Sequence, residues 1–400
     1  MAPTRRDFIK NTLAATAVAI ATPDILLANP NKPDLLDKTK IKNLEIRNRM
    51  VRSSVWSGTA DSKGYVTDRT IDFYHTLATG NIGMILSGYM YVMTNGMGLP
   101  HQTGIYADDQ VVGLKRLTDA IHQEKGVVIG QLVHCLAKAD QQLFLKEGDE
   151  LWGASAVAPK PDAKMPKEMT KKDIVALVEA HGAAAKRCIQ AGFDGIQLHG
   201  AHGYGMNQFL SPYWNRRTDL YGGSEEKRYR IVGEIIEATR GAIGKDYPLL
   251  FKLSANDFEQ GGIQFPEAVS TAKRLAENGI DLIQVSGGCT RIEENCIKEG
   301  IEPGSKDEAY FLEYARKIKE AVGIPVMTVG GVRSLPVAQA IVRDKNVDYV
   351  SFGRPLIREP HLIKRWIDGD TSPAACISCN QCFDTGREGK GVSCFWLRSA

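Results

Sequence analysis

Eight short apolar runs, separated by amphipathic stretches, set the strongest limit on how this 400-residue chain can fold. Such alternation is typical of βαβ units and a parallel sheet. We predict strands over residues 49–54, 82–88, 127–132, 193–199, 249–254, 280–286, 325–330 and 347–353. We predict helices between them, including residues 170–192, 226–243, 266–278, 306–322 and 336–343. Eight such units without a long-period repeat favour a (β/α)8 TIM barrel, of class α/β, over a doubly wound sheet.

Three further segments complete the predicted organisation. The stretch DKTKIKNLEIRN, residues 37–48, has the pattern of a hairpin that could close the barrel floor. Residues 133–169 form a long excursion after the third strand, and a loop of that length in a compact domain usually has a function. We therefore expect a leader and linker over residues 1–30, a barrel over residues 31–370 and a cysteine-rich extension over residues 371–400.

The N-terminus carries the pattern of an export signal. TRRDFIK precedes the apolar run TLAATAVAIA, which is too short to span a bilayer, and small-residue cleavage sites end at Ala21 and Ala28. The order S/T-R-R-x-F-x-K resembles the twin-arginine motif, an address that the twin-arginine translocase reads. An amphipathic N-terminal helix is the alternative. We expect a periplasmic protein without a stable membrane span in its mature form.

The charge pattern argues against nucleic acid as a partner. The net charge is +3 and is mixed along the chain, with no basic block suited to a phosphate backbone. A small-molecule substrate is the partner that such a barrel predicts.

Several predicted strands carry polar residues on one face. Side chains alternate between the two faces of a strand, so Lys252 shares a face with Ser254 and His199 shares one with Gln197. If these faces point inward, the carboxyl-terminal mouth of the barrel is ringed by Gln131, His199, Lys252 and Ser286. Barrel active sites lie at that mouth. Polar residues scattered over solvent-exposed strand ends are the alternative.

Glycines end the last two predicted strands. Gly330 and Gly331 follow the seventh strand, and Gly353 and Arg354 follow the eighth. Barrels commonly bind a phosphate there through backbone N–H groups that small residues leave exposed. Glycine also ends strands for conformational reasons. The two pairs together favour a phosphate-bearing ligand.

The most specific segment is GFDGIQLHGAHGYGMNQFLSPYWNRRTDLYGGSEEKRYR, residues 192–230. It resembles the Old Yellow Enzyme family of FMN-containing barrel oxidoreductases through HGAHGY, NQFLSP, RTD-YGGS and R-R. The resemblance extends over roughly residues 39–400, including NRMVRSSVW and GQL-H.

The resemblance implies a role for each matching residue. His199 and His202 match the pair that hydrogen-bonds the substrate's activating oxygen, and Tyr204 matches the tyrosine that delivers a proton. A metal-ligand pair and structural histidines are the alternatives for His199 and His202. The positions implied to bind FMN are Ser53, Ser54, Gly88, Gln131, Lys252, Gly330, Gly331, Gly353 and Arg354. The implied reaction is that of an ene-reductase, in which hydride from FMN N5 and a proton from Tyr204 reduce an activated alkene. Amine oxidation of the trimethylamine dehydrogenase type uses the same frame.

Two positions depart from the family pattern. Most members have arginine where this chain has Lys252, and lysine supplies the positive charge without the bidentate fork. Lys252 therefore also admits a Schiff-base lyase or aldolase. Trp56 stands where the trimethylamine dehydrogenase branch has the cysteine that bonds its flavin, so nothing supports covalent attachment.

Four cysteines lie near the C-terminus in the order C-x2-C-x2-C-x11-C, at Cys376, Cys379, Cys382 and Cys394. Their spacing and position resemble those of the two-domain branch, where such a group holds a [4Fe–4S] cluster between FMN and an FAD-binding half. Four thiolates suit a cluster, and zinc would accept the same set. Two disulfides are a third possibility in an exported protein.

The sequence ends six residues after Cys394, so we expect the FAD- and NAD(P)H-binding half to be missing. A periplasmic flavin without that half needs another electron source. We therefore expect electrons to pass through the cluster to or from a redox protein. The rival prediction is an NAD(P)H-dependent ene-reductase that carries a structural zinc.

Overall fold

The computed structural model describes residues 32–140, 150–289 and 297–398. The chain divides into two units, Met1–Pro33 and Asp34–Ala400, and every helix and strand described below belongs to the second. The predicted export leader lies outside the described residues. Within the described ranges, no helix combines the length and apolar character that a membrane crossing requires.

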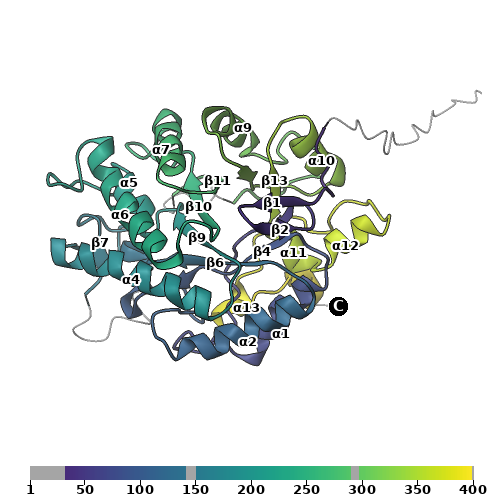
Figure 1. The fold of residues 1–400 in the computed structure, drawn as a ribbon, viewed down its shortest axis with the longest axis horizontal. Helices are drawn as coiled ribbons and strands as arrows, with labels where there is room; N and C mark the ends of the chain where they lie inside the picture. The colour runs from purple at the N-terminus through teal and green to yellow at the C-terminus, as the bar shows by residue number, and fades with distance from the viewer. Residues whose placement is uncertain (1–31, 141–149, 290–296, 399–400) are drawn as a thin grey trace, which may run out of the picture. The chain divides into compact units, whose positions relative to one another are not determined.

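Eight parallel strands form a closed barrel, as predicted (Figure 1). They are β3 (Met50–Arg52), β4 (Met84–Leu86), β6 (Val128–Val133), β9 (Gly195–Gly200), β10 (Leu249–Ser254), β11 (Leu282–Ser286), β12 (Val326–Thr328) and β13 (Tyr349–Phe352). The pairing of β13 with β3, which aligns Phe352 with Arg52, closes the ring. A short strand, β5 (Met90–Tyr91), adds to the end of β6. Each predicted strand contains or closely overlaps an observed one.

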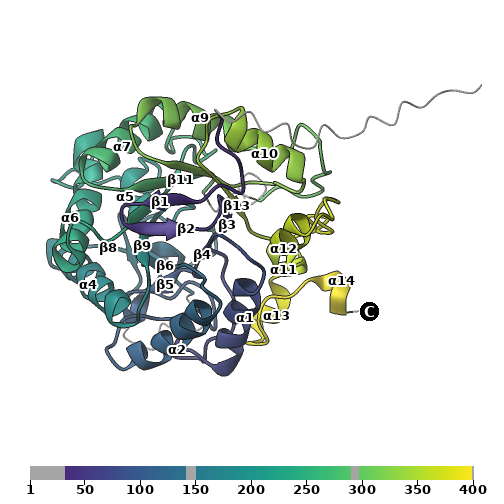
Figure 2. The same ribbon diagram turned by 45° about the vertical axis from the view of Figure 1, so that its right-hand side comes forward.

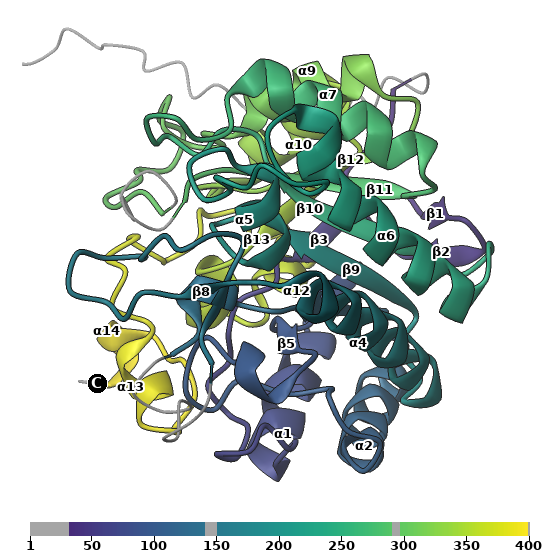
Figure 3. The same cartoon turned by 90° about the vertical axis from the view of Figure 1, so that its left-hand side faces the viewer.

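Helices surround the strands (Figure 2). The longer ones are α1 (Asp68–Ala78), α2 (Gln110–Gln123), α4 (Lys171–Gln190), α6 (Glu225–Ile243), α7 (Phe265–Glu277), α9 (Leu312–Ala321) and α10 (Leu335–Arg343). Thr170 and Asp173 form the predicted capping box at the start of α4. α4 and α6 lie side by side on the outside of the barrel (Figure 3).

One predicted helix starts later than its sequence pattern indicated. We expected it from residue 306, but α9 begins at Leu312. The preceding residues are bound to the loop after β12 instead: the Glu308 carboxylate accepts hydrogen bonds from the Arg333 and Ser334 N–H groups, and Tyr310 N–H donates to the Gly330 carbonyl. These long-range bonds compete successfully with the local helical ones.

An N-terminal hairpin closes the barrel floor, as predicted. It consists of β1 (Thr39–Ile41) and β2 (Leu44–Ile46), which pair antiparallel. Its buried Ile41 and Ile46 pack against inward-facing apolar side chains at the amino ends of the strands, namely Val51, Met84, Leu86, Ile129, Leu250, Leu282, Met327 and Tyr349. This layer fills the lower barrel, and the polar inward-facing residues of the strands lie nearer the opposite mouth.

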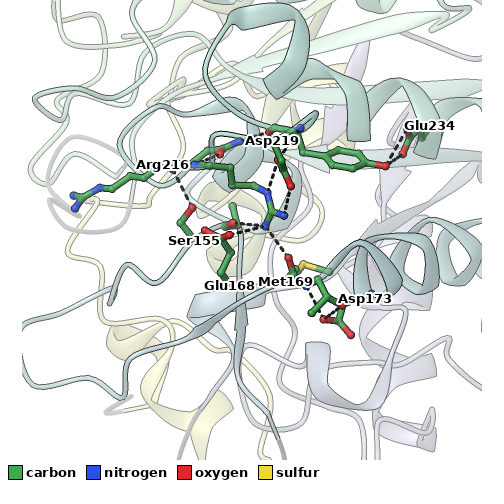
Figure 4. Close-up of polar contacts among 12 residues, drawn as sticks. Ser155, Glu168, Met169, Asp173, Arg216, Asp219 and Glu234 are labelled. Carbon is green, nitrogen blue, oxygen red and sulfur yellow. Dashed lines mark hydrogen bonds and ion pairs between the residues drawn. The ribbon is translucent and has the colours of Figure 1, made fainter.

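The excursion after β6 is attached to the segment that follows α5 (Gly205–Leu210). It contains a short 3-10 turn, η2 (Leu136–Lys138), and two short strands, β7 (Trp152–Gly153) and β8 (Lys167–Glu168). Arg217 donates to the carbonyls of Ala154 at 3.0 Å and Met169 at 2.7 Å, while its other nitrogens form a fork with Asp219 (Figure 4). Arg217 is buried, whereas the neighbouring Arg216 is exposed and extends away from this cluster.

The C-terminal extension packs against the loop that follows β3. It contains α13 (Asp384–Arg387) and α14 (Phe395–Arg398), and it follows α11 (Pro355–Arg358) and α12 (Leu362–Ile367), the helices after β13. The N–H groups of Gly391 and Val392 donate to the carbonyls of Gly58 and Ser57, and Trp56 stacks on Phe383 with centroids 6.3 Å apart. Trp56 therefore anchors the extension to the barrel.

Candidate active site at the carboxyl ends of the strands

A row of hydrogen-bonded amides crosses the barrel above its apolar floor. Gln131 on β6 donates to Gln197 on β9 at 2.6 Å, and Gln197 donates to Gln284 on β11 at 3.2 Å. Gln284 then donates to the hydroxyls of Ser53 at 3.1 Å and Ser351 at 2.9 Å. All five side chains are buried, and buried amides that satisfy one another hold a fixed geometry. We call this set the glutamine row.

The three side chains predicted to be catalytic meet at the mouth of the barrel. His199 lies near the end of β9, in register with Lys252 on β10, and His202 and Tyr204 lie in the turn that follows. The His199 ring centroid is 5.4 Å from that of His202 and 5.2 Å from that of Tyr204. Lys252 is buried beside the histidines. The structure therefore brings together all four residues.

Strained backbone presents His202 to the site. His202 has a φ of 62°, a left-handed conformation that costs a residue with a Cβ about 1 kcal/mol or more, and Gly203 follows with a φ of 70°. Hydrogen bonds offset this cost. The His202 N–H donates to Ser254 Oγ at 3.1 Å, its Nε2 lies 2.7 Å from Ser286 Oγ, and the Gly203 N–H donates to Asn207 Oδ1 at 2.5 Å. The turn is held from β10, β11 and α5.

Both histidines are neutral at neutral pH. Burial lowers the pKa of His199 and of His202 well below the usual value, and the positive charge of Lys252 lowers each further. A neutral imidazole keeps one N–H donor for a ligand. The lysine charge beside both rings also disfavours a metal cation there, and no group of three or more metal-ligating side chains was found in the described ranges.

Two side chains at this site had no recognisable sequence signal. The Tyr204 hydroxyl donates to the Tyr89 hydroxyl at 3.5 Å, and burial raises the pKa of Tyr89 well above the usual value. Lys138, in η2, places its Nζ 3.8 Å from the Tyr204 ring centroid and 3.0 Å from the His202 carbonyl. Both residues reach Tyr204 from loops far away in the sequence, so no local motif identifies them.

Four backbone N–H groups at the ends of β12 and β13 have no acceptor among the described residues: those of Gly330, Gly331, Gly353 and Arg354. Gly330 and Gly331 have φ values of 119° and 78°, and a Cβ on either would meet the Tyr310 ring within 3.0 Å. Only glycine fits both positions. Unpaired N–H groups in left-handed backbone form an anion-binding concavity, so this cradle fits the FMN phosphate.

The remaining predicted flavin contacts lie at the ends of three adjacent strands, β3, β4 and β6. Ser53 N–H donates to the Phe352 carbonyl at 2.9 Å, and Ser54 Oγ donates to Gln131 Oε1 at 2.8 Å. The Gly88 N–H donates to the Tyr74 hydroxyl at 2.5 Å. These bonds fix the strand ends beside the glutamine row, where the predicted isoalloxazine site lies.

The four C-terminal cysteines are free thiols, and three of them, Cys376, Cys382 and Cys394, are buried. Burial, together with the neighbouring thiols of Cys376, Cys379 and Cys394, raises the pKa of Cys382 to about 11. The four therefore lie within electrostatic range of one another.

Three arginines from the barrel face this cysteine segment. Arg333 Nη2 donates to Ser378 Oγ at 2.5 Å, Arg354 Nη1 donates to the Ser378 carbonyl at 3.3 Å, and Arg358 Nη1 lies 3.5 Å from Cys394 Sγ. Arg333 and Arg354 are buried. The Arg354 guanidinium, predicted to hold the FMN phosphate, is thus directed at the cysteine segment, and only its backbone N–H joins the cradle.

Comparisons with known proteins agree with this geometry. Residues 34–370 match the model of the NADH:flavin oxidoreductase / NADH oxidase family. The chain is 36% identical over 323 residues to an NADPH dehydrogenase of Geobacillus sp. (strain WCH70), covering 80% of this chain and 90% of that protein. It is 35% identical over 355 residues to an NADH oxidase of Thermoanaerobacter brockii, covering 87% of this chain and 53% of that protein.

The fold also resembles a solved 2-naphthoyl-CoA reductase in complex with 2-naphthoyl-CoA. The TM-score is 0.82 at 29% identity, over 90% of this chain and 56% of that one. This chain thus spans about half the length of some of its relatives. From the matched family, the barrel and the site, we conclude that the chain belongs to the NADH:flavin oxidoreductase / NADH oxidase family, the Old Yellow Enzyme-type FMN-dependent oxidoreductases.

Proposed function

We propose that this protein is an FMN-dependent ene-reductase that reduces an activated C=C bond of a small molecule. One observation carries the proposal: His199, His202 and Tyr204 converge at the barrel mouth above the glutamine row. The glycine cradle supports a phosphate-bearing cofactor at the same end, and Lys252 adds a buried positive charge. FMN bound there supplies the hydride.

The chain's own residues then have distinct tasks. The two neutral imidazoles donate hydrogen bonds to the carbonyl oxygen on which negative charge develops, and loss of one such donor costs about a hundred- to a thousandfold in rate. The Tyr204 O–H gives its proton to the α-carbon as general acid. Burial raises the pKa of Tyr89, so it stays a phenol whose oxygen accepts the hydrogen bond from the Tyr204 hydroxyl and orients that hydroxyl.

Two measurements test this proposal. Denaturation should release a yellow flavin with free-FMN fluorescence; a colourless protein whose Lys252 is trapped by borohydride would support an aldolase instead.

Tyr204→Phe should impair the oxidative half-reaction with an alkene while leaving flavin reduction nearly intact. Tyr213→Phe is the matched control, because Tyr213 packs edge-to-face on Trp214 outside the catalytic cluster. Equal loss in both half-reactions would mean that Tyr204 has a different role, and flavin reduction by amines would favour an amine dehydrogenase.

We further propose that the cysteine segment holds a [4Fe–4S] cluster through Cys376, Cys379, Cys382 and Cys394. The C-x2-C-x2-C-x11-C spacing supports it, as does the Arg358 guanidinium 3.5 Å from Cys394 Sγ. Four thiolates and a cluster carry net negative charge, which buried guanidiniums compensate. Zinc is the alternative occupant. The electrons would pass between the cluster and a redox protein carrier.

The proposed compartment is the periplasm, reached by the twin-arginine translocase. TRRDFIK supports this proposal. Replacing both arginines, Arg5 and Arg6, with lysine should move the protein from the periplasmic to the cytoplasmic fraction. An unchanged distribution would contradict the export proposal without bearing on the chemistry.

A further inference from the structure

We propose that Lys138 is a positioning residue for proton transfer: its ammonium group orients Tyr204 and stabilises the phenolate that remains after Tyr204 gives up its proton. The inference rests on the proposed ene-reductase function and adds a residue to it. Lys138 comes from the excursion after β6, not from the HGAHGY segment that carries the family resemblance.

The contact geometry couples Lys138 to the whole catalytic turn. Its Nζ lies 3.8 Å from the Tyr204 ring centroid, within the range of a cation–π contact, and donates to the His202 carbonyl at 3.0 Å. One ammonium group thus contacts both ends of the turn from His202 to Tyr204. A change in its position would move the proton donor relative to the imidazoles.

Gln208 fixes Lys138 against this turn. Its buried side chain donates to the Gly203 carbonyl at 2.7 Å and to the Cys135 carbonyl at 3.2 Å, and it accepts from the Ala137 N–H at 3.4 Å. The same amide therefore binds the catalytic turn on one side and η2 on the other. Lys138 is held in place from a helix, α5, rather than by its loop alone.

The charges around Tyr204 make the ammonium group important. Tyr89 and His199 face Tyr204 directly, and Cys135, His202 and Lys252 lie next to them. The two histidines are neutral, and burial raises the pKa of Tyr89 well above the usual value and that of Cys135 to about 12. Positive charge in this set comes from Lys138 and Lys252.

The charge balance of the proton transfer shows what Lys138 does. The Tyr204 O–H bond breaks, a C–H bond forms at the substrate's α-carbon, and the electron pair of the O–H bond stays on the tyrosine oxygen. One negative charge therefore moves from the substrate enolate to Tyr204, which later regains a proton from water. An ammonium group at the ring stabilises this charge where it arrives. Lys138 keeps its own proton throughout.

The test compares Lys138→Met, Lys138→Gln and Lys138→Arg in the holoenzyme. Phenolate ultraviolet absorbance is titrated with pH for each protein, and the curve of the matching protein that also carries Tyr204→Phe is subtracted. We expect Tyr204 in Lys138→Met and Lys138→Gln to ionise about one pH unit higher than in the wild type, a tenfold change in the equilibrium. Lys138→Arg should restore most of the wild-type value, because it keeps the charge.

Half-reaction kinetics supply the second measurement. In Lys138→Met the oxidative half-reaction should slow by about tenfold with flavin reduction unchanged. An unchanged Tyr204 titration in both neutral variants would overturn the proposal, as would an unchanged oxidative rate. Failure of the ene-reductase function itself looks different: Tyr204→Phe would then leave alkene reduction intact, while the titration would still report the contact with Lys138.

Discussion

The barrel mouth and the cysteine segment satisfy their polar groups in opposite ways. At the mouth, Gln131, Gln197 and Gln284 bond one another, so the geometry is complete within the protein. In the cysteine segment, burial and neighbouring thiols oppose ionisation of Cys382, and the Arg358 guanidinium approaches Cys394 Sγ. Preorganised dipoles suit catalysis, whereas clustered thiols beside cations suit a bound metal group. The mouth is preorganised for a reaction, and we propose that the extension is completed by a bound metal group.

The variant with the largest expected effect tests whether the two regions bind their cofactors independently. Cys382→Ser should reduce bound iron from about four atoms per chain to nearly none, because a cubane needs its thiolate ligands. FMN should remain bound, since the cradle glycines lie at the ends of β12 and β13. Iron and flavin are measured on the same sample.

Cys289→Ser is the matched control for that experiment. Cys289 is also buried, but it follows β11 and lies outside the C-x2-C-x2-C-x11-C group. Loss of iron in both variants, or loss of FMN in Cys382→Ser, would show that the two regions are not independent.

A second change breaks the glutamine row. Gln284→Leu leaves the Gln197 side-chain N–H and the hydroxyls of Ser53 and Ser351 without this partner, and each unsatisfied buried group costs about 1–3 kcal/mol. The free energy of unfolding should fall by at least that amount, and FMN should dissociate more readily. Urea denaturation and flavin release measure the two effects. Gln264→Leu, at an exposed position before α7, should leave flavin release unchanged and alter the free energy of unfolding by no more than about 0.5 kcal/mol.

A third prediction concerns the pH dependence of stability. Burial lowers the pKa of His181 on α4 to about 4, below its unfolded value near 6.5. Between pH 6.5 and 4 the unfolded chain therefore binds a proton that the folded chain does not. The stability that comes with the neutral buried ring is fully present above pH 6.5 and is lost as the pH falls toward 4. His181→Leu should flatten the stability curve by about 1.4 kcal/mol per pH unit in that window.

His181→Gln provides the check on that experiment. Both variants lack the ionisable ring but differ in packing, so they should share one pH slope whatever their absolute stability. If the two variants differed in the pH slope of their stability, the effect would come from altered packing and not from loss of the ionisable ring. Burial raises the pKa values of Asp257 and Glu267, so these groups make stability fall as the pH rises. Their contribution is the same in both His181 variants and cancels when the variants are compared.

Local patterns predicted the scaffold because they depend on neighbours in the sequence. The strands followed from alternation, the floor hairpin from its short apolar pairs, and the turn from His202 to Tyr204 from a contiguous motif. Long-range features could not be found this way. The bond between Gln197 and Gln284 depends on how three strands align, and the approach of Lys138 to Tyr204 depends on how a loop folds back.

Side-chain direction was the other unpredictable quantity. Arg354 follows the glycine at the end of β13, so sequence alone suggested a phosphate contact. In the structure its guanidinium donates to Ser378 and Asn380, across 24 residues or more of chain. The motif predicted the position of the backbone, but the packing of the extension determines where the long side chain of Arg354 points.

One anaerobic preparation tests most directly the claim that the barrel flavin exchanges electrons through the cysteine segment. Iron, sulfide and zinc are measured first, and flavin absorbance is then followed after mixing with NADH, NADPH or reduced viologen. We predict an iron- and sulfide-replete protein that the nucleotides reduce only slowly and that viologen reduces at once. Zinc without iron, together with rapid bleaching of the flavin by either nucleotide, would contradict the claim.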